Sequence, residues 1–181
     1  MRTLLVAAIG LTLSGCGNLA NVRSYSTPYA EPTSGDTARM RVITNGMARG
    51  VPARGCIDWN SPGAGVMAVA QPGFASRNGQ NLGMPVSQTR VQATDLVRTE
   101  LKVPANQPFT VNFQSQGSVS NGYSYSCQQS LRFTPQAGKD YELIMLESGQ
   151  CLMSLQRLDT TANPSTVALE PARLCNASDA L

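Results

Sequence analysis

The stretch FTVNFQS, residues 109–115, decides the fold class. Its apolar residues Phe109, Val111 and Phe113 recur at every second position, which is the period of a β-strand with one buried face. The stretch DYELIMLE, residues 140–147, is apolar almost throughout its middle and predicts a central strand buried on both faces. No stretch of helical length carries an apolar stripe. The sequence therefore predicts an all-β protein, a single small antiparallel β-sandwich.

Further strands are expected on either side of these two. They cover residues 39–44, 65–70, 96–103, 123–133 and 151–158, and the fourth would place Tyr123, Tyr125, Cys127, Leu131 and Phe133 on one face. Asn45-Gly46 is expected to form a tight hairpin turn, and Asn121-Gly122 offers another. Residues 71–88, which contain three glycines and two prolines, are expected to form a long loop.

Two stretches carry a resemblance to a known family: VPANQPFTVNF (103–113) and LRFTPQAGKDYELIML (131–146). They resemble the core of a prealbumin-like (transthyretin-like) group of bacterial lipoproteins of unknown function. The group's pattern F-x-P-x-x-G-x-x-Y is filled here by Phe133, Pro135, Gly138 and Tyr141. The resemblance covers roughly residues 99–158. It implies a transthyretin- or immunoglobulin-like sandwich, and it brings no catalytic residues. We expect the pattern to form a hairpin with Phe133 and Tyr141 packed at its ends.

The N-terminus has the features of an export signal. Arg2 precedes the apolar run LLVAAIGLTL (4–13), which is too short to span a bilayer as a helix. The following Leu13-Ser14-Gly15-Cys16 resembles the lipobox of bacterial lipoproteins. That resemblance implies cleavage before Cys16 and acylation of this cysteine, including a palmitate-type chain, which would anchor the protein in a membrane. The alternative is an ordinary secretory signal with an incidental cysteine.

The residues after Cys16 bear on the destination. By resemblance to lipoprotein sorting in Gram-negative bacteria, the absence of an aspartate next to Cys16 implies delivery to the outer membrane, with the domain on the periplasmic face. The expected organisation is a signal peptide over 1–15, the lipidated cysteine and a flexible tether over 16–37, and the sandwich domain over 38–181. The tether is expected because its sequence is polar and rich in Ser, Thr, Pro and Gly.

The four remaining cysteines are Cys56, Cys127, Cys151 and Cys175. An even number in an oxidising compartment predicts two disulfides. The chain has no histidine and no C-x-x-C pair, so we expect neither a bound metal nor another cofactor, and no catalytic thiol.

The pairing of these cysteines is restricted by strand spacing. If strands 123–133 and 151–158 flank 140–147 in one sheet, they lie roughly twice 4.8 Å apart, beyond the reach of a disulfide. This disfavours Cys127–Cys151, unless Cys151 lies in the turn beyond the ladder. The remaining pairings are Cys56–Cys127 with Cys151–Cys175, which we favour because it fastens the C-terminal segment to the strand before it, and Cys56–Cys151 with Cys127–Cys175.

Charge and motif content exclude several functions. The chain carries a net charge of +3; without residues 1–15, which contain only Arg2, it has 13 basic against 11 acidic side chains, or +2. With 14% charged residues and no basic run, no nucleic-acid partner is expected. The absence of histidine removes the usual catalytic triads. Asp58 is interpreted as a turn cap, and Asp140 with Glu142 as a solvated sheet edge.

Recognition is therefore the function we expect. Arg54, Trp59 and Phe74 could form a small binding patch, since arginine and aromatic residues dominate binding hot spots; the alternative is that Trp59 covers an open end of the sandwich. The favoured interpretation is a non-enzymatic interaction or envelope-accessory module that binds an envelope protein. One alternative is an inhibitor of a soluble target such as a host hydrolase, with residues 54–65 inserting into its cleft. Another is a glycan-cleaving enzyme that uses carboxylates. The oligomeric state is left open, because edge strands can pair between copies.

Overall fold

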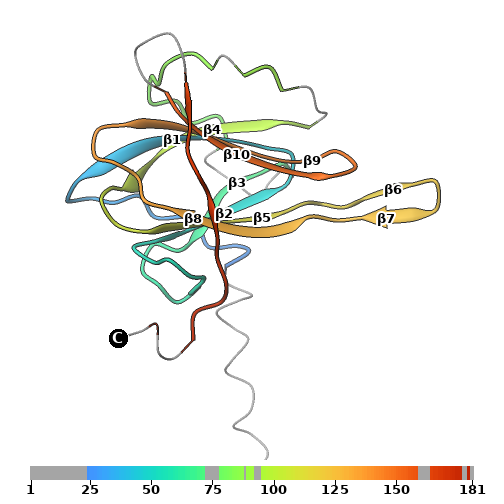
Figure 1. The fold of residues 1–181 in the computed structure, drawn as a ribbon, viewed down its shortest axis with the longest axis horizontal. Coiled ribbons are helices and arrows are strands. Elements are labelled where there is room, and N and C mark those ends of the chain that lie inside the picture. The colour runs from blue at the N-terminus through green and yellow to red at the C-terminus, as the bar shows by residue number, and fades with distance from the viewer. Residues whose placement is uncertain are drawn as a thin grey trace, which may run out of the picture.

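The computed structural model describes residues 24–71, 78–87, 89–91, 95–158, 164–176 and 179 (Figure 1). Two of the predicted functional residues, Cys16 and Phe74, lie outside this part of the chain. The described residues form two packed β-sheets and one separate two-stranded hairpin. The prediction of a small all-β sandwich is confirmed. Among the described residues, no helix is long and apolar enough to cross a membrane.

Each sheet has five strands. The first has the order β11-β10-β9-β1-β4 and contains β1 (Thr37–Thr44), β4 (Val97–Pro104), β9 (Asp140–Glu147), β10 (Cys151–Arg157) and β11 (Ser165–Thr166). The second has the order β12-β8-β5-β2-β3 and contains β2 (Met47–Pro52), β3 (Gly65–Val69), β5 (Phe109–Gln114), β8 (Gln128–Phe133) and β12 (Glu170–Pro171). The hairpin consists of β6 (Ser118–Ser120) and β7 (Tyr123–Tyr125). One pair departs from the antiparallel expectation: β1 and β9 run parallel, so the first sheet is mixed.

The core follows the period-two pattern of β5. Phe109, Val111 and Phe113 are fully buried between the sheets. Phe109 is part of a row of aromatic rings in edge-to-face and tilted contact, with centroid distances of 5.8, 6.3 and 5.5 Å along Tyr29, Phe109, Phe133 and Tyr141. Aromatic pairs in these orientations stabilise a core beyond the area that they bury.

Two predicted hairpins are instead corners between the sheets. Asn45-Gly46 joins β1 of the first sheet to β2 of the second. Asn45 closes the end of β9, because its side-chain amide donates to the Glu147 carbonyl at 2.7 Å and its side-chain oxygen accepts from the Glu147 amide at 3.0 Å. The F-x-P-x-x-G-x-x-Y segment joins β8 to β9 in the same way. Phe133 and Tyr141 pack together as expected, but across a corner rather than a hairpin.

The flexible tether predicted over residues 16–37 is wrong from Ser24 onward. Tyr29 is fully buried, and its backbone amide donates to Val66 at 2.8 Å. The Val66 amide in turn donates to Thr27 at 2.8 Å. Gly65 permits this close approach, because a Cβ at that position would collide with the backbone of Thr27 and Pro28. The segment around Tyr29 is thus hydrogen-bonded to β3 of the second sheet and belongs to the folded domain.

Both favoured disulfides are wrong. The structure pairs Cys127 with Cys151, with a Cα–Cα distance of 5.6 Å, and Cys56 with Cys175, with a Cα–Cα distance of 5.0 Å. The expectation failed because it placed strands 123–133 and 151–158 in one sheet. Because β8 belongs to the second sheet and β10 to the first, Cys127 and Cys151 meet across the sandwich rather than along a ladder.

The C-terminal segment closes one side of the sandwich. Its strand β11 pairs with β10 at the edge of the first sheet, and its strand β12 pairs with β8 at the edge of the second. The red segment in Figure 1 therefore crosses from one layer to the other before it reaches Cys175. There the Cys56–Cys175 disulfide fastens it to the loop after β2.

Candidate functional site

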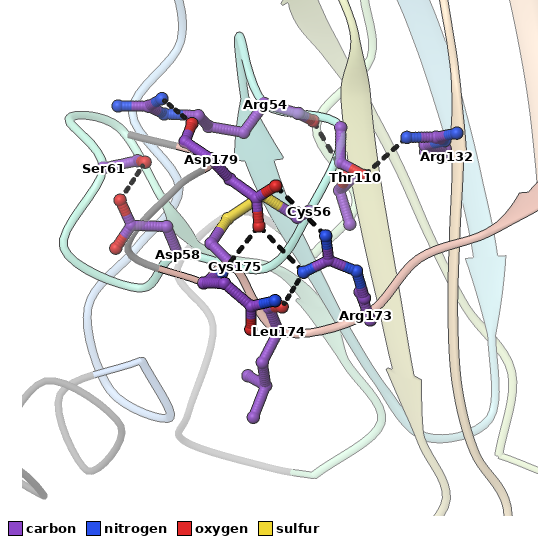
Figure 2. The surroundings of a disulfide bond; sticks show 12 residues. Arg54, Cys56, Asp58, Ser61, Thr110, Arg132, Arg173, Leu174, Cys175 and Asp179 are labelled. Carbon is purple, nitrogen blue, oxygen red and sulfur yellow. Dashed lines mark hydrogen bonds and ion pairs between the residues drawn. A yellow bond between two sulfur atoms is a disulfide. The ribbon is translucent and has the colours of Figure 1, made fainter. Parts of the chain in front are cut away.

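An open pocket of about 680 Å³ lies beside the Cys56–Cys175 disulfide (Figure 2). Three arginines line it from separate parts of the chain. Arg54 lies in the loop after β2, Arg132 lies in β8, and Arg173 lies after β12. A pocket with three guanidinium groups favours a ligand that carries an oxyanion, because the planar fork of arginine matches the geometry of carboxylate and phosphate groups.

The three arginines differ in their partners. Arg132 donates to the Glu170 carboxylate at 2.9 and 3.1 Å, and Arg173 donates to both oxygens of the Asp179 carboxylate at 2.8 and 3.1 Å. Arg54 donates only to the backbone carbonyl of Asp179, at 3.4 Å, and has no carboxylate partner among the described residues. Within the described residues that line the pocket or pair with its arginines, positive charge therefore exceeds negative charge by one.

Two residues of the predicted recognition patch, Arg54 and Trp59, lie in the described part of the chain. Arg54 lines the pocket. The ring of Trp59 instead lies against the buried guanidinium of Arg49, with 4.2 Å between the ring centroid and the guanidinium carbon. The ring centroid of Tyr25 lies 4.1 Å from the same carbon. Burial lowers the pKa of Arg49, and an interaction with Tyr25 partly opposes this. Trp59 thus covers a buried cation, a contact worth up to about 2 kcal/mol when desolvated.

Sequence reasoning missed Arg132 and Arg173. Strand alternation predicts that Arg132 points away from the core, since Leu131 and Phe133 flank it, but not which residues surround it. A usable signal was present nonetheless: the segment ARGC (53–56) and the segment ARLC (172–175) share the pattern A-R-x-C. The disulfide joins these two segments.

The candidate carboxylates have structural contacts. Asp58 caps its own loop, accepting from the Asn60 amide and the Ser61 hydroxyl at 3.0 Å each, so its interpretation as a turn cap is confirmed. The interpretation of Asp140 and Glu142 as a solvated edge is wrong, because β9 is an interior strand. The side chain of Asp140 pairs with Arg39, with two contacts of 2.6 Å.

Glu142 belongs to a buried ion cluster under the segment 79–87. Arg41 donates to Glu100 at 2.7 Å and to Glu142 at 3.1 Å. The second oxygen of Glu100 accepts from the backbone amides of Leu82 and Met84 at 2.6 and 3.2 Å. The cluster therefore holds the segment 79–87 against the outer face of the first sheet.

The same contacts predict a pH effect. Burial of Glu100 opposes its ionised form, but the hydrogen bonds from Arg41, Leu82 and Met84 outweigh burial and lower its pKa. A lowered folded-state pKa gives stability that is complete above the ordinary value of about 4.3 and is lost as the pH falls through the folded-state value. We expect Glu100→Gln to flatten the decline in urea midpoint between about pH 5 and 3. Parallel declines for the variant and the parent protein would contradict this assignment.

A second candidate surface is the hairpin of β6 and β7, which projects beyond the sandwich (Figure 1). Its turn residues Asn121 and Gly122 have φ angles of 51° and 78°, as the tight turn predicted from the sequence requires. Val119 and Tyr123 have exposed fractions of 78% and 69%, and Tyr125 is 41% exposed. The expected single strand over 123–133 is broken after Tyr125, which carries both tyrosines out of the core.

The base of this hairpin is fixed to the sandwich. Cys127 lies two residues after the end of β7 and forms the disulfide to Cys151. The Cys127 amide donates to the Ser115 hydroxyl at 2.8 Å, and the Ser118 hydroxyl donates to Glu147 at 2.6 Å. The hairpin is therefore presented from a rigid base.

Similarity to known proteins adds no assignment to this fold. The predicted resemblance to transthyretin-like lipoproteins stays a prediction. Searches of protein-family models, curated protein sequences and solved structures find no match to this chain.

Proposed function

We propose that this protein is an outer-membrane lipoprotein, anchored through Cys16, whose sandwich acts in the periplasm as a non-enzymatic interaction module. Its main recognition element is the projecting β6–β7 hairpin, and its partner is a protein of the envelope. The observation that carries the proposal is the exposure of Val119, Tyr123 and Tyr125 on an element that is fixed at its base by a disulfide.

The composition of the hairpin supports a recognition role. The stretch SQGSVSNGYSYS, residues 115–126, contains no charged residue and consists mainly of Ser, Tyr, Gly and Asn. The same residue types are enriched in antibody binding loops, where tyrosine supplies large contact area at low entropic cost and the small residues supply hydrogen bonds. Preorganisation by the Cys127–Cys151 disulfide would reduce the cost of ordering the hairpin on binding.

The faces of the hairpin suit insertion between two walls of a partner. Tyr123 and Tyr125 pair with Ser120 and Ser118 across the ladder and share one face, because their positions alternate with Ser124. Val119 pairs with Ser124 on the opposite face. Both faces thus present apolar side chains, and a groove of low charge would complement them.

Anchoring would hold the domain near the bilayer. Ser24 lies only eight positions after Cys16, and its hydroxyl already accepts a hydrogen bond of 2.6 Å from Arg49 within the fold. Eight residues span at most about 29 Å when fully extended. Partners of a lipidated form would therefore be those within a short distance of the membrane surface.

The hairpin also favours the second function, inhibition of a soluble target such as a host hydrolase. Residues 54–65 are a poor inserting loop, because the Cys56–Cys175 disulfide ties them to the C-terminal segment and Ser61 is buried. The β6–β7 hairpin projects instead (Figure 1). It is the described element with the shape to enter an enzyme cleft.

The anchor can be tested by metabolic labelling. We expect the protein in its native envelope to incorporate labelled palmitate and the variant Cys16→Ser to lose at least nine-tenths of this label (about tenfold), since the thiol is the acylation site. Mass spectrometry of the N-terminal peptide should show a mature chain that begins at Cys16. Equal labelling of the two proteins would contradict lipidation at Cys16.

A further inference from the structure

Asp179 occupies part of the arginine pocket (Figure 2). Its carboxylate accepts from Arg173 through two hydrogen bonds of 2.8 and 3.1 Å and from the Asn176 amide at 2.6 Å. Its backbone carbonyl accepts from Arg54 at 3.4 Å. The pocket thus binds one acidic residue of its own chain by both the side chain and the main chain.

The frame of the pocket is rigid. Arg54 and Arg173 each lie two residues before a cysteine of the same disulfide. Ile57 and Leu174 form a parallel bridge beside it, in which the Ile57 amide donates to Arg173 at 2.8 Å and the Cys175 amide donates to Ile57 at 3.0 Å. Two equivalent A-R-x-C segments therefore present their guanidinium groups from a cross-linked base, which lowers the cost of ordering them around a ligand.

The pocket has room and charge for more than Asp179. Its volume of about 680 Å³ lies within the range of small-ligand sites, about 300–1,000 Å³. Glu170, the partner of Arg132, does not line the pocket, and 68% of its side chain is exposed. Arg54 has no carboxylate partner among the described residues. An entering carboxylate could therefore pair with Arg54 and compete with Asp179 for Arg173.

We propose that this pocket is a binding site for an aspartate- or glutamate-bearing peptide segment of a partner protein, and that Asp179 occupies it in cis. The occupant is acidic because the three arginines outnumber the two carboxylates that pair with them, which leaves one positive charge to complement. It is a peptide because the pocket receives the main-chain carbonyl of Asp179 as well as its carboxylate. Hydrogen bonds from Arg173 and from the Asn176 amide keep the pKa of the Asp179 carboxyl below its ordinary value. The site is independent of Cys16 and of the β6–β7 hairpin.

The test uses the full chain and a peptide copy of its own C-terminal residues. The probe is the sequence NASDAL (176–181), acetylated and amidated so that aspartate supplies its sole carboxylate and carrying a fluorophore for anisotropy. We expect Asp179→Asn to bind the probe at least tenfold (about 1.4 kcal/mol) more tightly than the parent protein, because the competing carboxylate is removed. Adding Arg173→Ala, or Arg54→Ala in a second variant, should reduce that binding at least about tenfold.

Two controls make the result specific. The probe with Asn in place of its aspartate should not bind the Asp179→Asn variant. Arg157 donates to the side chain of Gln136, in the loop between β8 and β9, and does not line the pocket. The variant Arg157→Ala should therefore leave binding unchanged. Equal binding of the two probes, equal binding with and without Arg173, or no binding to the Asp179→Asn variant at millimolar probe would each overturn the proposal. Unchanged unfolding temperatures would show that the variants are folded.

Discussion

We expect Arg41→Ala to lower the free energy of unfolding by about 3–5 kcal/mol, the cost of removing one partner from a buried ion cluster. Arg41 is 7% exposed and lies between Glu100 and Glu142, and Glu142 is fully buried. The variant would leave two buried carboxylates without their cation. One oxygen of Glu142 already has no hydrogen-bond partner among the described residues, which leaves this carboxylate especially dependent on Arg41.

The matched control is Arg39, two residues earlier on the same face of β1. Its side chain is 39% exposed, and it pairs with Asp140. Because solvent screens this pair, Arg39→Ala should cost about 1 kcal/mol or less. Urea unfolding of both variants at pH 7 measures the difference. Similar losses for the two variants would show that burial does not set the strength of these pairs.

The second large effect concerns the disulfides. We expect the double variant Cys56→Ser, Cys175→Ser to lose about 5 kcal/mol of unfolding free energy, because this disulfide closes a loop with a sequence separation of 119. The Cys127–Cys151 disulfide closes a loop with a sequence separation of 24, so the double variant Cys127→Ser, Cys151→Ser should lose about 3.5 kcal/mol. Chemical unfolding monitored through Trp59 gives both values.

Thiol titration separates the correct pairing from the one favoured by the sequence. Each of these double variants should show no more free thiols than the parent protein, because each removes a whole disulfide. Cys56→Ser with Cys127→Ser should instead expose two additional thiols. Two additional thiols in the Cys56, Cys175 variant would contradict the pairing described here.

The sequence was sufficient for strands and turns but not for their assignment to sheets. The alternation in β5 identifies the face that packs between the sheets, and the continuous apolar run of β9 predicts a strand buried on both faces; both are local properties of the chain. The alternation does not reveal that Thr110 and Asn112, on the other face of β5, are buried as well. Asn45-Gly46 reports a turn equally well whether the next strand pairs with the previous one or crosses to the other sheet. The crossing depends on packing between distant strands, and the wrong disulfides followed from that one error.

The candidate site shows the same division. Arg54 could be selected from the sequence because it lies two residues before a cysteine in an irregular loop. Arg132 and Arg173 join it only because β12 pairs with β8 and the Cys56–Cys175 disulfide returns the C-terminal segment to that loop. Likewise, the two tyrosines of β7 fit the alternation of a buried strand, and their exposure depends on where the chain leaves the sandwich.

Site-specific photocrosslinking in the native envelope tests the central claim, recognition by the β6–β7 hairpin. A photoreactive residue replaces Tyr123 in one strain and Val86 in another, because Val86 is also highly exposed, at 88%, but lies in the segment that covers the first sheet. We predict that the Tyr123 position captures one discrete envelope protein, that the Val86 position does not, and that Tyr125→Ser weakens the capture from Tyr123. Identical products from both positions, or none from Tyr123, would contradict the account.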